Sequence, residues 1–268
     1  MSTILLKTAI ATNTGHLPIK IAKMLRRADE YTNLCVVAAY EVLNEYNDII
    51  STYSAEDKTI ILSTKFGPIE TNFRYLDTIF DFGESQGSPI LFSHSVHNTA
   101  SGYISRIFNF KGPIYSISSY TYPLIKALLT AIALLKQNLA KLILIINAEI
   151  ESDLLNKGIY KLINYQNFSI PSYAIAWLLT NQNNSTDKPT LELANINFKE
   201  QTDNRLLQTL FDDIIIKYHQ KTKYSKLYNL DIEFTKDIER LFNSKFNNIE
   251  FEINSNIIQI TGYIYKNN

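Results

Sequence analysis

A short polar segment of this sequence contains the residues most suited to chemistry. His94 and His97 lie three residues apart within the run Ser-His-Ser-Val-His-Asn at positions 93–98. On a helix, residues with this spacing share one face, and imidazole nitrogen is a common zinc ligand. A serine beside a histidine could also be an activated nucleophile, although the chain has no Gly-X-Ser-X-Gly motif. The alternative is a polar segment that only begins a helix, and we expect no metal there.

The chain has a single cysteine, Cys35. One cysteine excludes an intramolecular disulfide, a cysteine-rich zinc site and a Cys-X-X-Cys redox pair. Cys35 lies on the apolar stripe of a predicted helix, so we expect a buried thiol that packs as a small apolar side chain. The other histidines, His16 and His219, are far from His94 and His97 in the sequence. We therefore expect neither a metal nor a cofactor.

Net charge, the absence of glycine-rich motifs and the length of the apolar runs exclude further classes of protein. The 268 residues include 26 basic and 26 acidic side chains, so no bulk positive charge exists to bind nucleic acid. There is no Gly-X-Gly-X-X-Gly or Walker-type loop. The longest apolar runs, residues 124–135 and 142–146, are too short to span a membrane, and no signal peptide is evident. We expect a soluble, cytoplasmic protein without membrane insertion.

The candidate residues must be positioned by alternating helices and strands. Apolar residues at helical spacing predict amphipathic helices over residues 19–46 and 70–82. An apolar run at residues 59–63 predicts a buried strand between them. The second helix is expected to turn four apolar side chains inward: Phe73, Leu76, Ile79 and Phe80.

Further strands are predicted at residues 115–119, 141–148, 172–179 and 190–196, with an apolar helix at residues 123–138. Such alternation is typical of α/β proteins, in which helices cover both faces of a sheet. We therefore expect an α/β fold.

The C-terminal part has a different pattern. Helices are predicted at residues 203–219 and 237–242, followed by a hairpin around a turn at residues 254–256. The hairpin strands are expected to alternate four apolar residues: Phe251, Ile253, Ile258 and Ile260. We predict one domain over residues 1–200 and a short α+β tail over residues 201–268.

Four short motifs follow one another between positions 65 and 149. They are Lys-Phe-Gly-Pro at 65–68, Ser-Pro-Ile-Leu-Phe at 88–92, Lys-Gly-Pro-Ile-Tyr-Ser-Ile-Ser-Ser at 111–119, and a strand ending Asn-Ala-Glu at 147–149. This order resembles the N-terminal half of β-ketoacyl synthases, in which a Gly-Pro turn feeds a strand reading close to Tyr-Ser-Ile-Ser-Ser-Ala-Cys. The resemblance implies a thiolase-like layered α-β-α half, with a mixed sheet covered by helices. It is closest to the branch that includes chain-length-factor-like subunits of aryl polyene and type II polyketide clusters.

The departures from the family pattern concern the chemistry. Thr121 stands where the family has its nucleophilic cysteine, nine residues after Gly112. A cysteine at a helix N-terminus is reactive because its thiolate is stabilised, whereas a threonine hydroxyl needs a base. The family's second half supplies two histidines and a lysine, but the corresponding part of this chain has only His219. Tyr122 and Pro123 replace small residues after the nucleophile. The resemblance therefore implies no catalytic residue in this chain.

Thr121 has two compatible interpretations. It is a degenerate nucleophile position that shapes a pocket at a dimer interface, or it is only the N-cap of the helix that begins near Pro123. Aromatic residues concentrate around it and are typical of interface cores, although ordinary core packing is the alternative. The residues that we expect to line the pocket or interface are Phe92, His94, His97, Asn98, Tyr115, Ile117, Ser119, Tyr120 and Tyr122.

Four basic residues, Lys20, Lys23, Arg26 and Arg27, cluster before an apolar helix. Such a cluster could meet an acidic carrier protein, whose charge would steer association. The alternative is an ordinary solvated helix face.

The resemblance implies a non-catalytic partner subunit of the chain-length-factor type. It would pair with a full-length, cysteine-bearing β-ketoacyl-ACP synthase in aryl polyene, polyketide or fatty acid biosynthesis, and would meet acyl carrier protein through that complex. In the family, the strand before the nucleophile, here residues 115–119, pairs with its counterpart across the dimer axis. Two alternatives stay open. One is a stand-alone acyl-thioester hydrolase or transferase that uses Thr121 or a serine with His94 or His97 as base. The other is a homodimeric scaffold.

Overall fold

The computed structural model describes residues 3–11, 15–119, 123–163, 172–181, 190–197, 213–217, 250–254 and 257–261. The helices are α1 (Ile19–Met24), α2 (Glu30–Leu43), η1 (Asn44–Tyr46), α3 (Asn47–Ser51), α4 (Ile69–Phe82), η2 (Glu84–Gln86), α5 (Pro89–Ser95), α6 (Thr99–Phe108), α7 (Pro123–Lys136) and α8 (Asp153–Ile163). The strands are β1 (Thr3–Ala11), β2 (Lys58–Thr64), β3 (Ile114–Ser118), β4 (Leu142–Glu149), β5 (Tyr173–Thr180), β6 (Thr190–Asn197), β7 (Asp213–Lys217), β8 (Glu250–Asn254) and β9 (Ile257–Thr261).

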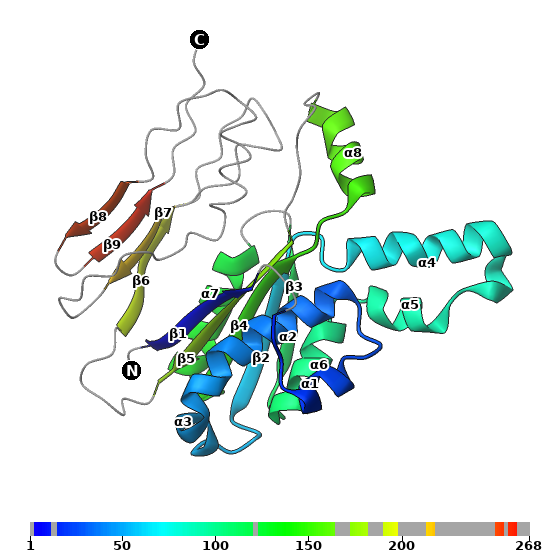
Figure 1. Cartoon of the computed structure of the whole chain (residues 1–268). Coiled ribbons are helices and arrows are strands. Elements are labelled where there is room, and N and C mark those ends of the chain that lie inside the picture. The colour runs from blue at the N-terminus through cyan, green and yellow to red at the C-terminus, as the bar shows by residue number, and fades with distance from the viewer. Residues whose placement is uncertain are drawn as a thin grey trace, which may run out of the picture.

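The strands form a mixed sheet in the order β3-β2-β4-β5-β1-β6-β7-β9-β8. Strands β3, β2 and β4 are parallel, and β5 and β1 continue the sheet antiparallel. Helices lie on both faces of the five-stranded part, with α2 and α6 on one side and α7 on the other (Figure 1). The α/β prediction with a helix-covered mixed sheet is therefore confirmed.

Two apolar clusters explain why β4 and β5 are apolar at nearly every position and why β2 is apolar in its middle. Side chains of a strand alternate between faces, and Leu144 and Ile146 of β4 pack toward α2 and α6, whereas Ile143 and Ile145 pack toward α7. Every residue of β2, β4 and β5 is buried. Cys35 is buried in the cluster on the α2 side, as its position on the apolar stripe predicts.

The helix predicted over residues 19–46 is interrupted. It ends at Met24 and resumes at Glu30, where Asp29 is the N-cap of α2. The Asp29 carboxylate accepts from the Thr32 backbone N–H (2.9 Å) and from the Thr71 hydroxyl (2.8 Å). Because an N-cap side chain satisfies a free N–H of the first turn, it favours a new helix start over continuation.

Helix α4 begins at Ile69, one residue before the predicted start, and ends at Phe82 as predicted, but the predicted inward direction of Leu76 and Phe80 is wrong. Both side chains are exposed, Phe80 at 79%. The reason is the placement of α4, which projects from the body beside α5 and leaves no core under that face (Figure 1).

The tail is described only in its strands. The hairpin prediction is confirmed, because Phe251 pairs with Ile260 and Ile253 with Ile258. The helix predicted over residues 203–219 is wrong at residues 213–217, which form β7 and pair with β6 and β9. The helix predicted over residues 237–242 lies outside the described residues. The division into residues 1–200 and 201–268 stays a prediction.

Strand β1 had no sequence prediction, because its apolar residues alternate only weakly with Thr and Lys. Its pairing with β5 is a contact between distant segments. Within the described part of the chain, no helix has the length and apolar character needed to cross a bilayer.

Candidate functional site

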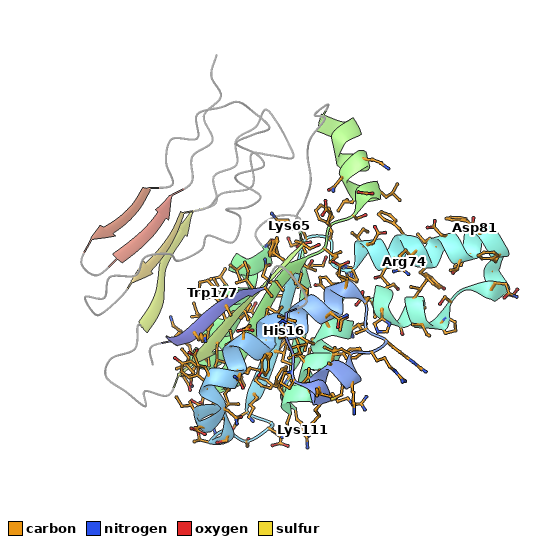
Figure 2. The ribbon with its side chains drawn as sticks, in the orientation of Figure 1. His16, Lys65, Arg74, Asp81, Lys111 and Trp177 are labelled. Carbon is orange, nitrogen blue, oxygen red and sulfur yellow. The ribbon has the colours of Figure 1, made fainter. Side chains whose placement is uncertain are left out.

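The carboxyl ends of three parallel strands meet at one edge of the sheet, where open α/β sheets place their ligand sites. Thr64 ends β2, Ser118 ends β3 and Glu149 ends β4. Figure 2 shows Lys65, the residue after β2, at this edge. Helix α7 follows β3 after a connection at residues 120–122, which lie outside the described residues. The predicted site residues Tyr120, Thr121 and Tyr122 are in that connection.

A buried carboxylate organises this edge. Glu149 is 1% exposed and accepts hydrogen bonds from the Thr64 hydroxyl (3.0 Å), the Phe66 N–H (3.0 Å) and the Lys65 N–H. Burial raises the pKa of Glu149 from 4.5 to about 7, and the hydrogen bonds from Lys65, Phe66 and Thr64 offset part of that rise. A carboxyl group with such a pKa exists in both protonation states near neutral pH.

The three residues that donate to Glu149 belong to a tight loop between β2 and α4. This loop, residues 64–67, is here called the β2–α4 loop. The Gly67 N–H donates to the Thr64 hydroxyl oxygen (2.6 Å). Gly67 has a φ of +62°, and a Cβ there would lie 2.7 Å from Cδ2 of His97. Both the conformation and the closeness of the imidazole require glycine.

The loop also connects to the end of β3. The Ser119 N–H donates to the Thr64 carbonyl oxygen (3.0 Å), so the residue two positions before Thr121 is fixed to β2. The Lys126 ammonium, in the first turn of α7, lies 2.5 Å from the Ser119 hydroxyl oxygen. The structure thus brings both Ser119 and His97 to this loop, Ser119 at Thr64 and His97 at Gly67.

His94 has both ring nitrogens engaged. Nδ1 lies 2.8 Å from the Ile90 carbonyl oxygen, which can only accept, so Nδ1 carries the proton. With the ring proton on Nδ1, Nε2 accepts from the Tyr103 hydroxyl, 3.2 Å away. His94 is buried, and these hydrogen bonds engage both of its ring nitrogens, so its burial does not require a ligand.

His97 lies against Gly67 rather than paired with His94. Partial burial lowers the pKa of His97, which favours the neutral ring. Across the described ranges, no cluster of three histidine, cysteine, aspartate or glutamate side chains is arranged to hold a metal ion.

The remaining predicted residues lie on α5, just before α6 and on β3. Phe92 lies on α5 and packs its ring against Tyr75 of α4, with centroids 5.4 Å apart. Asn98 precedes α6, and its carbonyl accepts from the Ser101 hydroxyl (2.7 Å). Tyr115 and Ile117 of β3 pack against the cluster under α7.

Strand β3 is the terminal strand in the sheet order, with β2 as its neighbour. Ile114 is 41% exposed, and Ser116 and Ser118 are exposed too. The Ser119 N–H and the Pro113 carbonyl face β2. In a parallel ladder, alternate residues face the same neighbour, so the backbone groups of Ser116 and Ser118 face away from β2.

The predicted basic cluster lies on the surface. Lys20, Lys23, Arg26 and Arg27 are all exposed on α1 and the turn after it. Ile19 beside them is 76% exposed. The described ion pairs, Lys7–Glu45 and Lys141–Asp57, involve none of these four.

Sequence reasoning did not select Thr64, Gly67, Lys126 or Glu149 as site residues. A signal existed for Glu149, which is the only charged side chain in the strand Leu142–Glu149. Nothing in the sequence alone indicated that this carboxylate is buried under the β2–α4 loop.

Comparisons with known proteins agree with this geometry. The family model described as "Beta-ketoacyl synthase, N-terminal domain" matches residues 8–222, and no curated protein matches. Three similar solved structures are a beta-ketoacyl synthase from Burkholderia phymatum STM815 (TM-score 0.60, 12% identity), the ishigamide ketosynthase/chain length factor (0.58, 14%) and the AntDE:AntF complex of a type II PKS acyl-carrier protein with its ketosynthase (0.58, 14%). Each match covers 73% of this chain and, in that order, 64%, 66% and 68% of the other. The chain belongs to the beta-ketoacyl synthase N-terminal domain family.

Proposed function

We propose that this chain is a non-catalytic subunit of the chain-length-factor type. It pairs with a cysteine-bearing β-ketoacyl-ACP synthase in aryl polyene, polyketide or fatty acid biosynthesis. The observation that carries the proposal is the place of the only cysteine. The family's nucleophile position holds Thr121, and Cys35 is fully buried in the core at α2.

Cys35 does not replace the missing nucleophile. Burial raises the pKa of its thiol well above the ordinary value, and the Coulomb effects of Asp29 and Glu149 add to the rise. The thiolate is the nucleophilic form of cysteine, so a buried neutral thiol is inert toward an acyl thioester.

The side of β3 that faces away from β2 supports pairing with another subunit. Its outward backbone groups have no neighbouring strand in the described sheet. An uncovered edge strand favours pairing with a further strand. The ishigamide structure is a ketosynthase/chain length factor, and a partner strand on β3 would extend the sheet of this chain into the second subunit.

The exposed basic cluster supports a meeting with acyl carrier protein through that complex. The AntDE:AntF structure contains an acyl-carrier protein with its ketosynthase. Four cations with Ile19 among them fit an acidic partner that also offers an apolar contact. The role of the cluster would be steering and orientation of the carrier protein.

The hydrolase alternative gains no support from the described bonds. It requires an imidazole base beside Thr121 or a serine. The Ser93 hydroxyl lies 3.2 Å from Nδ1 of His94, but this nitrogen donates to the Ile90 carbonyl and cannot accept the serine proton, and the Ser93 hydroxyl itself donates to the same carbonyl (2.8 Å). Nε2 of His94 is bonded to Tyr103, and the Ser119 hydroxyl lies against Lys126. A homodimeric scaffold is distinguished from the proposed heterodimer by the mass of the complex.

The test is co-expression of the full chain with the ketosynthase encoded nearest to it, followed by native mass spectrometry. We expect a one-to-one complex that condenses acyl and malonyl carrier substrates only when the ketosynthase keeps its cysteine. A chain that stays monomeric or forms only homodimers in the presence of that ketosynthase contradicts the proposal.

Ser116→Pro sharpens the test at the interface. Its N–H faces away from β2, so proline removes an outward donor without breaking a β2–β3 hydrogen bond. We expect at least tenfold weaker association with unchanged thermal stability of the free chain. Ser116→Ala is the matched control, because it keeps the N–H and should associate as the wild type does.

A further inference from the structure

The β2–α4 loop is tied to three separate elements. Glu149 at the end of β4 accepts from three donors of the loop. The Thr64 carbonyl accepts from Ser119 after β3, and the His97 ring lies against Gly67 from the junction between α5 and α6. A change at Glu149 therefore reaches both β3 and the start of α6 through one short loop.

Glu149 is an unusual group at such a junction, because its carboxylate is fully buried. On the loop, the charged group that acts on it is Lys65, which favours the ionised form. On α2, Tyr31 and Cys35 lie within electrostatic range of Glu149, and Asp29 is the N-cap of the same helix. None of these three groups carries a positive charge. Partial burial lowers the pKa of His97, which favours its neutral ring. Ionisation of Glu149 in the closed loop is thus only partly compensated.

We propose that Glu149 is a proton-dependent latch, which holds the β2–α4 loop closed when protonated and favours its opening when ionised. An open loop would return the carboxylate to water. Both oxygens accept in the closed form, and a protonated carboxyl still has acceptor capacity for these donors.

The direction of the pH effect follows from the difference in the pKa of Glu149 between the closed and the open loop. The closed form has a pKa of about 7, raised mainly by burial, and the ordinary value is 4.5. The closed form thus binds the proton more tightly than the open form, and the ratio of closed to open loop falls as pH rises between these values, by up to roughly tenfold per pH unit. Above about pH 7 both forms are ionised and the ratio is constant.

Opening removes the acceptor of the Ser119 N–H, so the latch also controls the end of β3. The inference concerns this chain alone and does not depend on the proposed partner, so its failure would leave the proposed function untouched.

Amide hydrogen exchange of the full chain tests the latch. Protection of the Lys65, Phe66 and Ser119 amides, corrected for the intrinsic rate, is measured from pH 5 to pH 8.5. We expect protection to fall by at least tenfold between pH 5 and pH 7 and then to level off. The amide of Ile145 in the middle of β4 is the internal reference and should show a smaller change.

Glu149→Gln is the main variant, because glutamine keeps the shape and does not titrate. We expect its loop protection to be independent of pH, whatever its absolute level. A pH dependence that survives in Glu149→Gln overturns the proposal, as does a flat profile in the wild type.

Two further variants keep the test decisive if Glu149→Gln folds poorly. Thr64→Val removes a donor that lowers the pKa of Glu149, so the levelling-off point should move to higher pH, and an unchanged point contradicts the latch. His97→Gln removes the neighbouring imidazole and should keep the fall. Loss of the fall in His97→Gln would assign the titration to His97 and overturn the proposal.

Discussion

At the scale of the residue, the same physical effect acts on three titratable side chains with different results. Burial raises the pKa of the Cys35 thiol and of the Glu149 carboxyl, and it lowers the pKa of the His97 imidazole. In each case the low-dielectric surroundings penalise the charged form. Burial thus keeps the Cys35 thiol inert, favours the neutral ring of His97 and brings the pKa of Glu149 to about 7.

The first prediction concerns Cys35. Because the thiol is fully buried, we expect no reaction with a thiol reagent such as Ellman's reagent at pH 8 while the chain is folded. One thiol should react at once in guanidinium chloride. Rapid reaction of the native chain would contradict the assignment of Cys35 to the core, and Cys35→Ala should remove the signal in both conditions.

The second prediction concerns His97. Its pKa in the folded chain lies below the ordinary 6.5, so the unfolded chain binds the proton more tightly and the folded chain loses stability as pH falls through that value. We expect the contribution of His97 to the free energy of unfolding to be complete above about pH 7. Urea denaturation from pH 5 to pH 8 measures it, with His97→Gln as the control that should lack this component. A component of the opposite sign would show that the imidazole gains a partner on folding.

At the scale of the element, β3 depends on a turn that brings two backbones close together. The Gly112 N–H donates to the Ala55 and Lys58 carbonyl oxygens at 3.2 and 3.0 Å. A Cβ on Gly112 would lie 2.5 Å from the Glu56 oxygen and 2.6 Å from the Lys58 oxygen. The Gly-Pro turn therefore has a steric reason, because it lets the chain pass the start of β2 and enter β3.

The third prediction compares two glycines. Gly112→Ala should lower the free energy of unfolding by roughly 1–3 kcal/mol, because backbone atoms must move to admit the methyl group. Gly102→Ala in α6 is the matched control, because its added Cβ would meet no atom within 4 Å. Gly102→Ala should raise stability by about 0.5–1 kcal/mol. Thermal and urea denaturation measure both, and equal effects of the two substitutions would contradict the close approach at Gly112.

At the scale of the whole molecule, zero net charge hides an uneven distribution. The cluster of Lys20, Lys23, Arg26 and Arg27 lies on one exposed segment, while the chain totals 26 basic and 26 acidic residues. A local field of this kind steers an acidic partner even when the net charge is zero. The α4–α5 pair, which projects from the body (Figure 1), carries further exposed apolar side chains.

The fourth prediction concerns this cluster. Replacing all four basic residues by glutamine should weaken the association of acyl carrier protein with the ketosynthase complex about tenfold at low salt. The difference from wild type should shrink as ionic strength rises, because salt screens exposed charges. Surface plasmon resonance at 50 and 300 mM salt measures it. Substitution of Lys111, Lys136, Lys157 and Arg74 by glutamine is the control for loss of charge elsewhere, and an equal effect of both sets would contradict a local docking surface.

The sequence alone was sufficient for the family and the α/β class, and it predicts a degenerate nucleophile position at Thr121. These depend on local signals: the Gly-Pro turn at residues 112–113, the apolar runs of the strands and the threonine at position 121. The hairpin with Phe251 paired to Ile260 was predictable for the same reason, since alternation and a short turn specify its register.

The tertiary structure decided what depends on contacts between distant segments. Strand β1 exists because β5, more than 160 positions later, supplies its hydrogen bonds. Phe80 is exposed because α4 projects from the body, although its helical pattern indicates an inward face. In the sequence, Glu149 is an ordinary acidic residue. Its burial under the β2–α4 loop raises its pKa to about 7. Desolvation depends on which atoms surround a group, and spacing along the chain does not encode that.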